Sequence, residues 1–155
     1  MLPTVAAAVL GNAFVGRESL TWFADLRRPR MQVPMPAFYA VGAAYYGVMG
    51  TVLHRADARG DREAYRLGLV VLAGNELWNA AFFGRRSTAT GFLGLLVFGV
   101  PVVALQRREA DDRTSALVLA PYTAWVLGYD IPWTYRLWRL NGKTPADDGP
   151  APSAE

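Results

Sequence analysis

The chain has 155 residues, of which 52% are hydrophobic, and 16 Lys or Arg residues against 13 Asp or Glu give it a net charge of +3. It has no cysteine and a single histidine, His54, which excludes disulfide bonds, cysteine nucleophiles, thiolate metal sites and multi-histidine metal centres. The basic residues are spread over the connecting segments instead of forming one stripe, which disfavours a nucleic-acid partner. We expect neither a metal nor a cofactor.

Charged residues fall in short groups separated by long apolar stretches. About 20 apolar helical residues cross the roughly 30 Å hydrocarbon core of a bilayer. The pattern predicts an all-α, multi-pass integral membrane protein with five transmembrane helices, at residues 2–22, 36–54, 65–84, 88–106 and 115–140. They form one predicted domain, residues 1–141. The tail at 142–155, rich in Gly, Pro and Ala, is expected to be disordered and without a function of its own.

The first predicted span is the least apolar, because Arg17 and Glu18 interrupt it near its end. No basic segment and no small-residue cleavage pattern accompanies it, so we expect it to be retained and not removed as a signal peptide. The next connector contains Pro29, Pro34 and Pro36, which prevent a regular helix, and its arginines are expected among lipid headgroups.

Short charged segments join the later spans, so neighbouring helices are expected to be antiparallel. The segments at residues 55–66 and 107–113 are dense in charge and are expected to be solvated. Lys and Arg are nearly balanced between the two sides, so the sequence does not predict the orientation in the membrane.

Two acids lie near the middle of predicted spans, Glu76 in the third and Asp130 in the fifth. An ionisable side chain at that depth costs at least about 2.5 kcal/mol, so a compensating role is expected. No Lys or Arg lies deep in any predicted span. Each acid is therefore expected to be neutral or hydrogen-bonded to Asn, Tyr or water, and both a structural and a functional role stay open.

The fifth span carries aromatic residues at spacings of three, four and four: Tyr122, Trp125, Tyr129 and Trp133. At about 100° per residue they lie within about 80° on one helix face, which indicates either a packing seam or the lining of a pocket. Trp22 and Trp138 lie near span ends, where Trp commonly anchors at the headgroups, and Trp22 is also a candidate cap for a pocket.

Two amides of the third span, Asn75 and Asn79, share a helix face with Trp78 and Phe82. Because an unsatisfied amide is costly in lipid, both should point into the bundle. They are expected to serve either as interhelical hydrogen-bonding groups or as polar contacts to a ligand.

Several local patterns recur in one order along the chain. They are W-F-x-x-L-x-x-P at residues 22–29, Y-x-x-x-M-G at 45–50, N-x-x-W followed by F-F at 75–83, P-Y-x-x-W at 121–125 and L-W-R-L-N at 137–141. This ordered set resembles the TspO/MBR family of tryptophan-rich sensory proteins over residues 1–141. The chain departs from the family at Met31, at Val41 or Tyr39, where tryptophans are usual, and at Tyr129, where a small residue is usual.

The resemblance implies a five-helix bundle with a pocket that opens toward the first loop and binds large flat hydrophobic ligands such as porphyrins or sterols. The expected function is therefore a membrane-embedded receptor or carrier for a tetrapyrrole, a sterol or an isoprenoid-like molecule. The expected ligand-binding residues are Trp22, Tyr45, Asn75, Trp78, Asn79, Phe82, Tyr122, Trp125, Tyr129 and Trp133.

Two alternatives stay open. A membrane enzyme of the isoprenoid or terpenoid cyclase or isomerase type would use Glu76 or Asp130 as a general acid, because an acid kept neutral by an apolar site can protonate an alkene or epoxide. A structural subunit would pair protomers through glycine-rich faces, at Gly42 and Gly50 or at Gly91, Gly94 and Gly99. A homodimer is expected only because the resembled fold often forms one.

Overall fold

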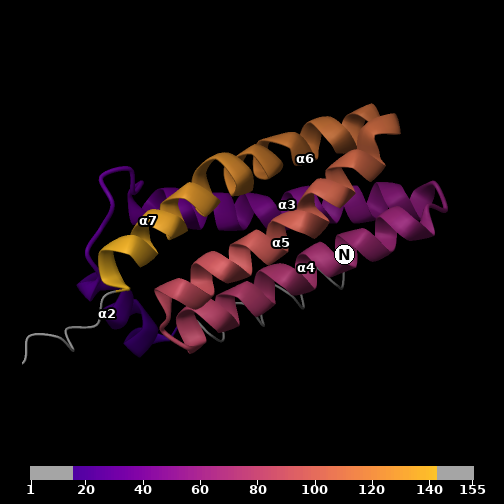
Figure 1. The fold of residues 1–155 in the computed structure, drawn as a ribbon. Coiled ribbons are helices and arrows are strands. Elements are labelled where there is room, and N and C mark those ends of the chain that lie inside the picture. Colours follow the sequence, from indigo (N-terminus) through magenta and orange to yellow (C-terminus); the bar gives the residue numbers. More distant parts are fainter. Residues whose placement is uncertain (1–15, 143–155) are drawn as a thin grey trace, which may run out of the picture.

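A computed structural model describes residues 16–142, and every regular element in that range is helical (Figure 1). The first elements are α2 (Arg17–Asp25), α3 (Met35–Ala58) and α4 (Arg62–Asn79), which continues into the π-helical turn η1 (Ala80–Gly84). They are followed by α5 (Thr88–Arg108) and the short 3-10 turn η2 (Glu109–Asp111). The last rod consists of α6 (Arg113–Trp125), the π-helical turn η3 (Val126–Asp130) and α7 (Ile131–Asn141).

The predicted all-α class and the order of the helical segments are confirmed. The four spans predicted from residue 36 onward correspond to α3, α4 with η1, α5, and the α6–η3–α7 rod. The first predicted span is described only at its end, as α2, and its residues 2–15 lie outside the described range, as do residues 143–155 of the predicted tail.

Helix boundaries follow ordinary capping chemistry. Pro34 precedes α3, and Pro36 occupies its first turn, where a missing N–H costs no hydrogen bond. The Asp61 carboxylate accepts from the Ala64 amide (3.1 Å) at the start of α4. Ser87 Oγ accepts from the Thr90 amide (3.2 Å) and caps α5 in the same way.

The long helices pack so that α4 lies against α5, α3 against both α4 and α6, and α5 against α7 (Figure 1). Small residues allow the close approaches. A Cβ on Gly68 would lie 2.6 Å from the Leu53 side chain of α3, and one on Gly74 would lie 2.9 Å from the Phe98 ring of α5. Close contact through glycine is typical of helices that pack within membranes.

The outer surface of the bundle is apolar. Leu77, Val97 and Val100 are 70%, 73% and 69% exposed, although each belongs to a hydrophobic helix. The helices at Arg62–Gly84 and Thr88–Asp111 are each long and apolar enough to cross a membrane. A large apolar outer surface of this kind suits contact with lipid.

The α5 glycines that were candidates for pairing protomers pack against side chains of the same chain. A Cβ on Gly91 would meet the Phe82 ring at 2.3 Å, and one on Gly94 would meet Trp78 at 3.1 Å. Gly99 faces Ile131 and Leu127. The α5 glycine face is therefore packed within the bundle, whereas nothing described lies within 4 Å of a Cβ on Gly42, and pairing of protomers stays a prediction.

The end of the bundle away from α2 is held by an arginine–acid network, which we define as Arg55, Arg59, Glu109 and Asp112. Arg55 binds Asp112 through two hydrogen bonds (2.8 and 2.7 Å), and Arg59 binds Glu109 Oε2 (2.7 Å) and also Asp112. Glu109 is fully buried. The network joins the turn between α3 and α4 to the turn between α5 and α6.

The expectations about the two charged connectors are met in part. Helix α3 extends to Ala58 and α4 starts at Arg62, so most of the 55–66 segment is helical, yet Asp57, Arg62 and Glu63 are exposed as expected. The segment at 107–113 contains Glu109, which is buried and not solvated. Its ion pair with Arg59 offsets part of the cost of burying this carboxylate. The sequence pattern cannot reveal such a pairing between segments about fifty residues apart.

The acidic side chains at this end of the bundle should make the stability of the protein depend on pH. Hydrogen bonds from Arg55 and Ser115 lower the pKa of Asp112, and the Ala64 amide with Arg108 lowers the pKa of Asp61. Each folded-state pKa lies below the unfolded value of about 3.9, so the stabilisation is fully present above about pH 5 and decreases as pH falls toward the folded-state pKa. We expect a lower melting temperature in detergent at about pH 3 than at about pH 7.

The variant Asp112→Asn distinguishes the acid dependence caused by Asp112 from a general loss of stability at low pH. The variant should be less stable than the wild type near pH 7, and the difference between them should shrink on acidification. If the two proteins lost stability in parallel between about pH 7 and about pH 3, Asp112 would not contribute to the acid dependence.

Candidate ligand-binding cavity

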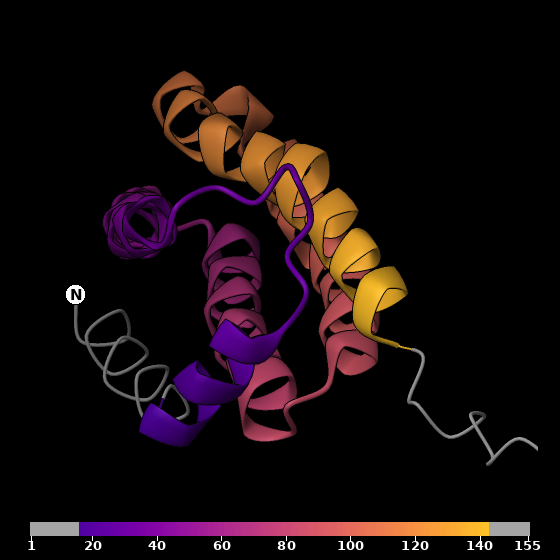
Figure 2. The same ribbon diagram turned by 90° about the vertical axis from the view of Figure 1, so that its left-hand side faces the viewer.

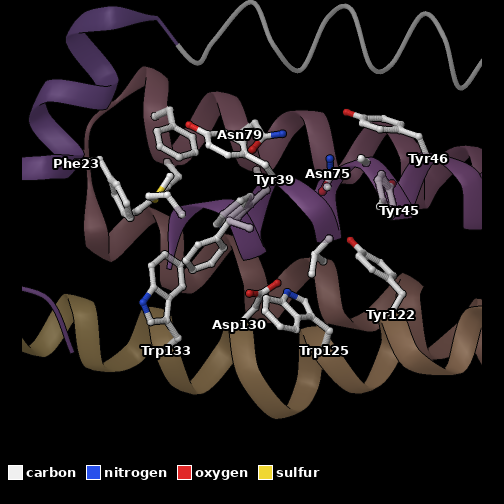
Figure 3. Close-up of a pocket in the computed structure, with 18 of the residues that line it drawn as sticks. Phe23, Tyr39, Tyr45, Tyr46, Asn75, Asn79, Tyr122, Trp125, Asp130 and Trp133 are labelled. Carbon is white, nitrogen blue, oxygen red and sulfur yellow. The ribbon is translucent and has the colours of Figure 1, made fainter. Parts of the chain in front are cut away.

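A cavity of about 490 Å³ lies inside the bundle at the end near α2, and we refer to it as the intrabundle cavity. Residues of α3 form one wall, α4 with η1 the second, and the α6–η3–α7 rod the third, with Leu20 and Phe23 of α2 at one end (Figure 3). Its lining is mostly aromatic or aliphatic, with a few polar side chains, which is typical of small-molecule sites.

Eight of the predicted ligand-binding residues line the cavity: Tyr45, Asn75, Trp78, Asn79, Phe82, Tyr122, Trp125 and Trp133. Trp22 and Tyr129 are not among the lining residues. Trp22 packs edge-on against Phe82, with ring centroids 5.4 Å apart, and Tyr129 lies 4.4 Å from Trp125. Both brace side chains that line the cavity.

The α4 wall is anchored to α5. Trp78 stacks on Phe82, with ring centroids 5.3 Å apart and planes inclined by 10°, and its indole N–H donates to the Gly91 carbonyl (2.9 Å). Phe82 belongs to the π-helical turn η1, which follows directly after Asn79. Extra residues in π turns alter the direction of the following side chains, and such turns are frequent at functional sites.

The opposite wall contains the second π-helical turn, η3, which ends at Asp130. The Thr134 hydroxyl donates to the Asp130 carbonyl (2.7 Å), next to Pro132, which has no N–H of its own. The Asp130 side chain lines the cavity and lies beside the Trp125 indole (Figure 3). Both π turns therefore border the cavity, one on each wall.

The segment between α2 and α3 crosses the end of the bundle beside α7 (Figure 2). The Val33 amide donates to the Tyr129 hydroxyl (2.8 Å), and the Trp133 indole N–H donates to the Gln32 side chain (3.3 Å). Asn141 holds the start of the segment through hydrogen bonds with the Arg27 backbone. The tyrosine that departs from the family pattern thus has a structural partner in this loop.

Glu76 does not line the cavity. Its Oε1 accepts from the Tyr46 hydroxyl (2.9 Å) and from Asn75 Nδ2 (3.3 Å), while Oε2 is buried without a partner in the described part of the chain. Tyr and Asn are among the partners that the sequence predicted for a buried acid. Of the two acids considered for catalysis, only Asp130 faces the cavity.

Most polar groups on the aromatic residues are already used within the protein. The Tyr45 hydroxyl donates to the Val71 carbonyl (3.1 Å), and Trp78, Trp133 and Tyr46 have the partners given above. Among residues 16–142, the Asn79 side chain makes no hydrogen bond, and Asn75 bonds only within α4, so neither amide joins two helices. The interhelical role considered for these amides is not observed in this range.

Sequence reasoning did not select several residues of the α2 and α3 wall. Phe38 packs against Trp125 and Trp133, with centroid distances of 6.3 and 5.1 Å, and Tyr39 and Val41 also line the cavity. The sequence feature that could have indicated these residues is the mixture of aromatic and small residues in this segment. The positions that face inward depend on how α3 is rotated against α4 and α6, which no local spacing determines.

Comparison with known proteins agrees with this architecture. The model of the TspO/MBR family matches residues 1–138. Human translocator protein is 30% identical over 139 residues, which cover 85% of this chain and 82% of the human protein. Protein CrtK of Rhodobacter capsulatus is 30% identical over 148 residues, which cover 91% of this chain and 92% of that protein. Tryptophan-rich protein TspO of Chlorobaculum tepidum is 24% identical over 128 residues, which cover 79% and 81% of the two chains.

The family match covers α2, the first three long helical rods and all but the end of the fourth, and it contains four of the five ordered motifs and the start of the fifth. The protein is accordingly an integral membrane protein, and the exposed leucines and valines of its helices suit that environment. The chain belongs to the TspO/MBR family.

Proposed function

We propose that this protein is a receptor or carrier that binds a hydrophobic small molecule in the intrabundle cavity. The observation that carries the proposal is a cavity of about 490 Å³ between the membrane helices, with aromatic walls and few polar groups. This volume lies in the usual range for ligand pockets, about 300–1,000 Å³. Aromatic faces would supply contact area, and the amides of Asn75 and Asn79 would orient the ligand.

The ligand class that fits best is a flat or elongated apolar molecule, such as a tetrapyrrole, a sterol or an isoprenoid. Three tryptophans line the cavity, Trp78, Trp125 and Trp133, so bound ligand should change tryptophan emission. The direct test is titration of the purified protein in detergent with a porphyrin ester, a fluorescent sterol and retinol. Absence of saturable quenching by all of them would contradict the proposal.

A substitution that fills the cavity makes this test specific. Gly42 lines the cavity, and within the described structure nothing lies within 4 Å of a Cβ placed there. Gly42→Phe should therefore fold normally and weaken ligand binding at least about tenfold, because its ring occupies ligand volume. Gly47→Phe is the matched control, since Gly47 is on the same helix, has the same free space and does not line the cavity.

Equal loss of binding in both glycine variants would indicate that the ligand does not occupy the cavity. Unchanged binding in both would lead to the same conclusion. Thermal unfolding of each variant in detergent distinguishes a blocked site from a damaged fold.

The enzymatic alternative has one specific observation in its favour. Asp130 lines the cavity among aromatic groups, and a neutral acid there could protonate an alkene or epoxide while Trp and Tyr faces stabilise the resulting cation. Comparison of lipid extracts from cells that express the wild type or Asp130→Asn would detect a product. Identical extracts in a host that supplies the substrate would favour binding without catalysis. A homodimer stays a prediction that rests on family resemblance.

A further inference from the structure

We propose that the intrabundle cavity selects its ligand by charge: Asp130 favours a hydrophobic molecule that carries a protonated amine and disfavours one that carries a carboxylate. The inference rests on the proposed function, because it concerns the ligand of the same cavity. It names a ligand class, the hydrophobic amine, and the residue that recognises it.

The described lining of the cavity contains one acidic side chain and no basic one. Among residues 16–142, Asp130 is the one lining residue with a formally charged side chain, and no Lys, Arg or His of this range lines the cavity. Each ion pair in this range lies outside the cavity, and none involves Asp130. Residues 1–15 contain no Lys, Arg or His in their sequence. No Lys, Arg or His of residues 1–142 therefore balances Asp130, and a cationic ligand would supply that charge.

Aromatic side chains surround Asp130 on its wall of the cavity. The Trp125 indole lies beside it (Figure 3), Tyr129 packs on Trp125 at 4.4 Å, and Phe38 lies 6.3 Å from Trp125. Aromatic faces attract ammonium groups through their quadrupole. An amine next to Asp130 would thus gain both an ionic hydrogen bond and contacts with aromatic rings, and charge-assisted hydrogen bonds are about twice as strong as neutral ones.

An anionic ligand would find no compensating charge in the described lining of the cavity. The wall that faces Asp130 across the cavity offers the amides of Asn75 and Asn79, which are neutral (Figure 3). A ligand carboxylate would lose its hydration without gaining a cationic partner, and it would share an apolar cavity with a second carboxyl group. The cavity therefore opposes dicarboxylate tetrapyrroles and tolerates the same ring system once its acids are esterified.

Three probes with one ring system test the inference: aminomethylpyrene, hydroxymethylpyrene and pyrenecarboxylic acid. Their affinities are measured by energy transfer from tryptophan in a nonionic detergent near neutral pH, with the wild type and Asp130→Asn in parallel. Each probe partitions into the micelles to the same extent with either protein. The ratio of its affinity for the wild type to its affinity for Asp130→Asn is therefore independent of this partition. Asp25→Asn, which removes an exposed acid at the end of α2, controls for general electrostatics.

We expect Asp130→Asn to weaken binding of the amine about tenfold, to strengthen binding of the acid, and to change binding of the alcohol less than about twofold. Asp25→Asn should leave all three affinities unchanged. Retained affinity for the alcohol shows that Asp130→Asn is folded. If Asp130→Asn does not bind the alcohol, the measurements are repeated with Asp130→Thr.

Saturable binding of the alcohol together with equal affinity ratios for all three probes would overturn charge selection and leave the proposed function intact. Tightest binding of the acid by the wild type would overturn it as well. Failure of every probe, of the porphyrin ester and of the sterol would contradict the proposed function itself. The porphyrin pair gives an independent readout, since protoporphyrin dimethyl ester should bind more tightly than the free diacid.

Discussion

Glu76→Lys is expected to prevent accumulation of folded protein in the membrane, whereas Glu76→Gln should leave folding nearly unchanged. Glu76 is 9% exposed and lies within α4, where it accepts hydrogen bonds from Tyr46 and Asn75. A lysine there cannot accept either hydrogen bond, and a buried cation costs about 2.5–3.5 kcal/mol even by insertion measurements. A glutamine keeps the shape and an acceptor oxygen for Tyr46.

The measurement is the yield of monodisperse protein by size-exclusion chromatography, followed by thermal unfolding in detergent. Tyr46→Phe is the companion variant: it leaves Glu76 Oε1 with Asn75 alone and should cost about 1 kcal/mol. In the Glu76→Gln background, Tyr46→Phe should lower the stability by a similar amount. If Glu76→Gln were as damaging as Glu76→Lys, an uncharged amide could not replace Glu76, and the expected tolerance of this position would be contradicted.

Much of the bundle could be predicted because each signal is local. An apolar stretch predicts a span, a proline-rich segment predicts a break, and the spacing of Tyr122, Trp125 and Trp133 predicts a shared helix face. These three residues do line one wall. The pairing of Trp78 and Phe82 on the opposite wall follows from their four-residue spacing, which places them on one face of α4 and η1.

Other features depend on contacts between distant segments. The position of Tyr129 outside the lining follows from the π turn η3 and from its hydrogen bond to Val33, which lies 96 residues away. The burial of Glu109 depends on Arg59 in the preceding hairpin. A helical periodicity of about 3.6 residues contains no information about where a π turn will shift the faces.

Gly91→Ala is expected to destabilise the protein by about 1–2 kcal/mol, although alanine is the better helix former by about 1 kcal/mol. The added Cβ would lie 2.3 Å from Phe82 Cδ2, far inside any normal contact. Phe82 is fully buried and cannot yield freely, because five aromatic rings surround it at centroid distances of 4.8 to 6.3 Å: Trp22, Phe23, Trp78, Phe83 and Trp133.

Gly91→Ala should also weaken ligand binding in the cavity, because Phe82 lines the cavity and the Gly91 carbonyl accepts the hydrogen bond that holds Trp78. Unfolding by SDS titration measures the stability, and retinol titration measures the binding. Gly47→Ala is the control, with free space around the new methyl group, and should be neutral or slightly stabilising. Phe82→Leu in the Gly91→Ala background should relieve the clash, so the double variant should be more stable than the sum of the single changes by at least about 1 kcal/mol. Strict additivity of the two changes would show that Gly91 and Phe82 are not in contact in the membrane, and the packing of α5 against η1 would then have to differ from the one described.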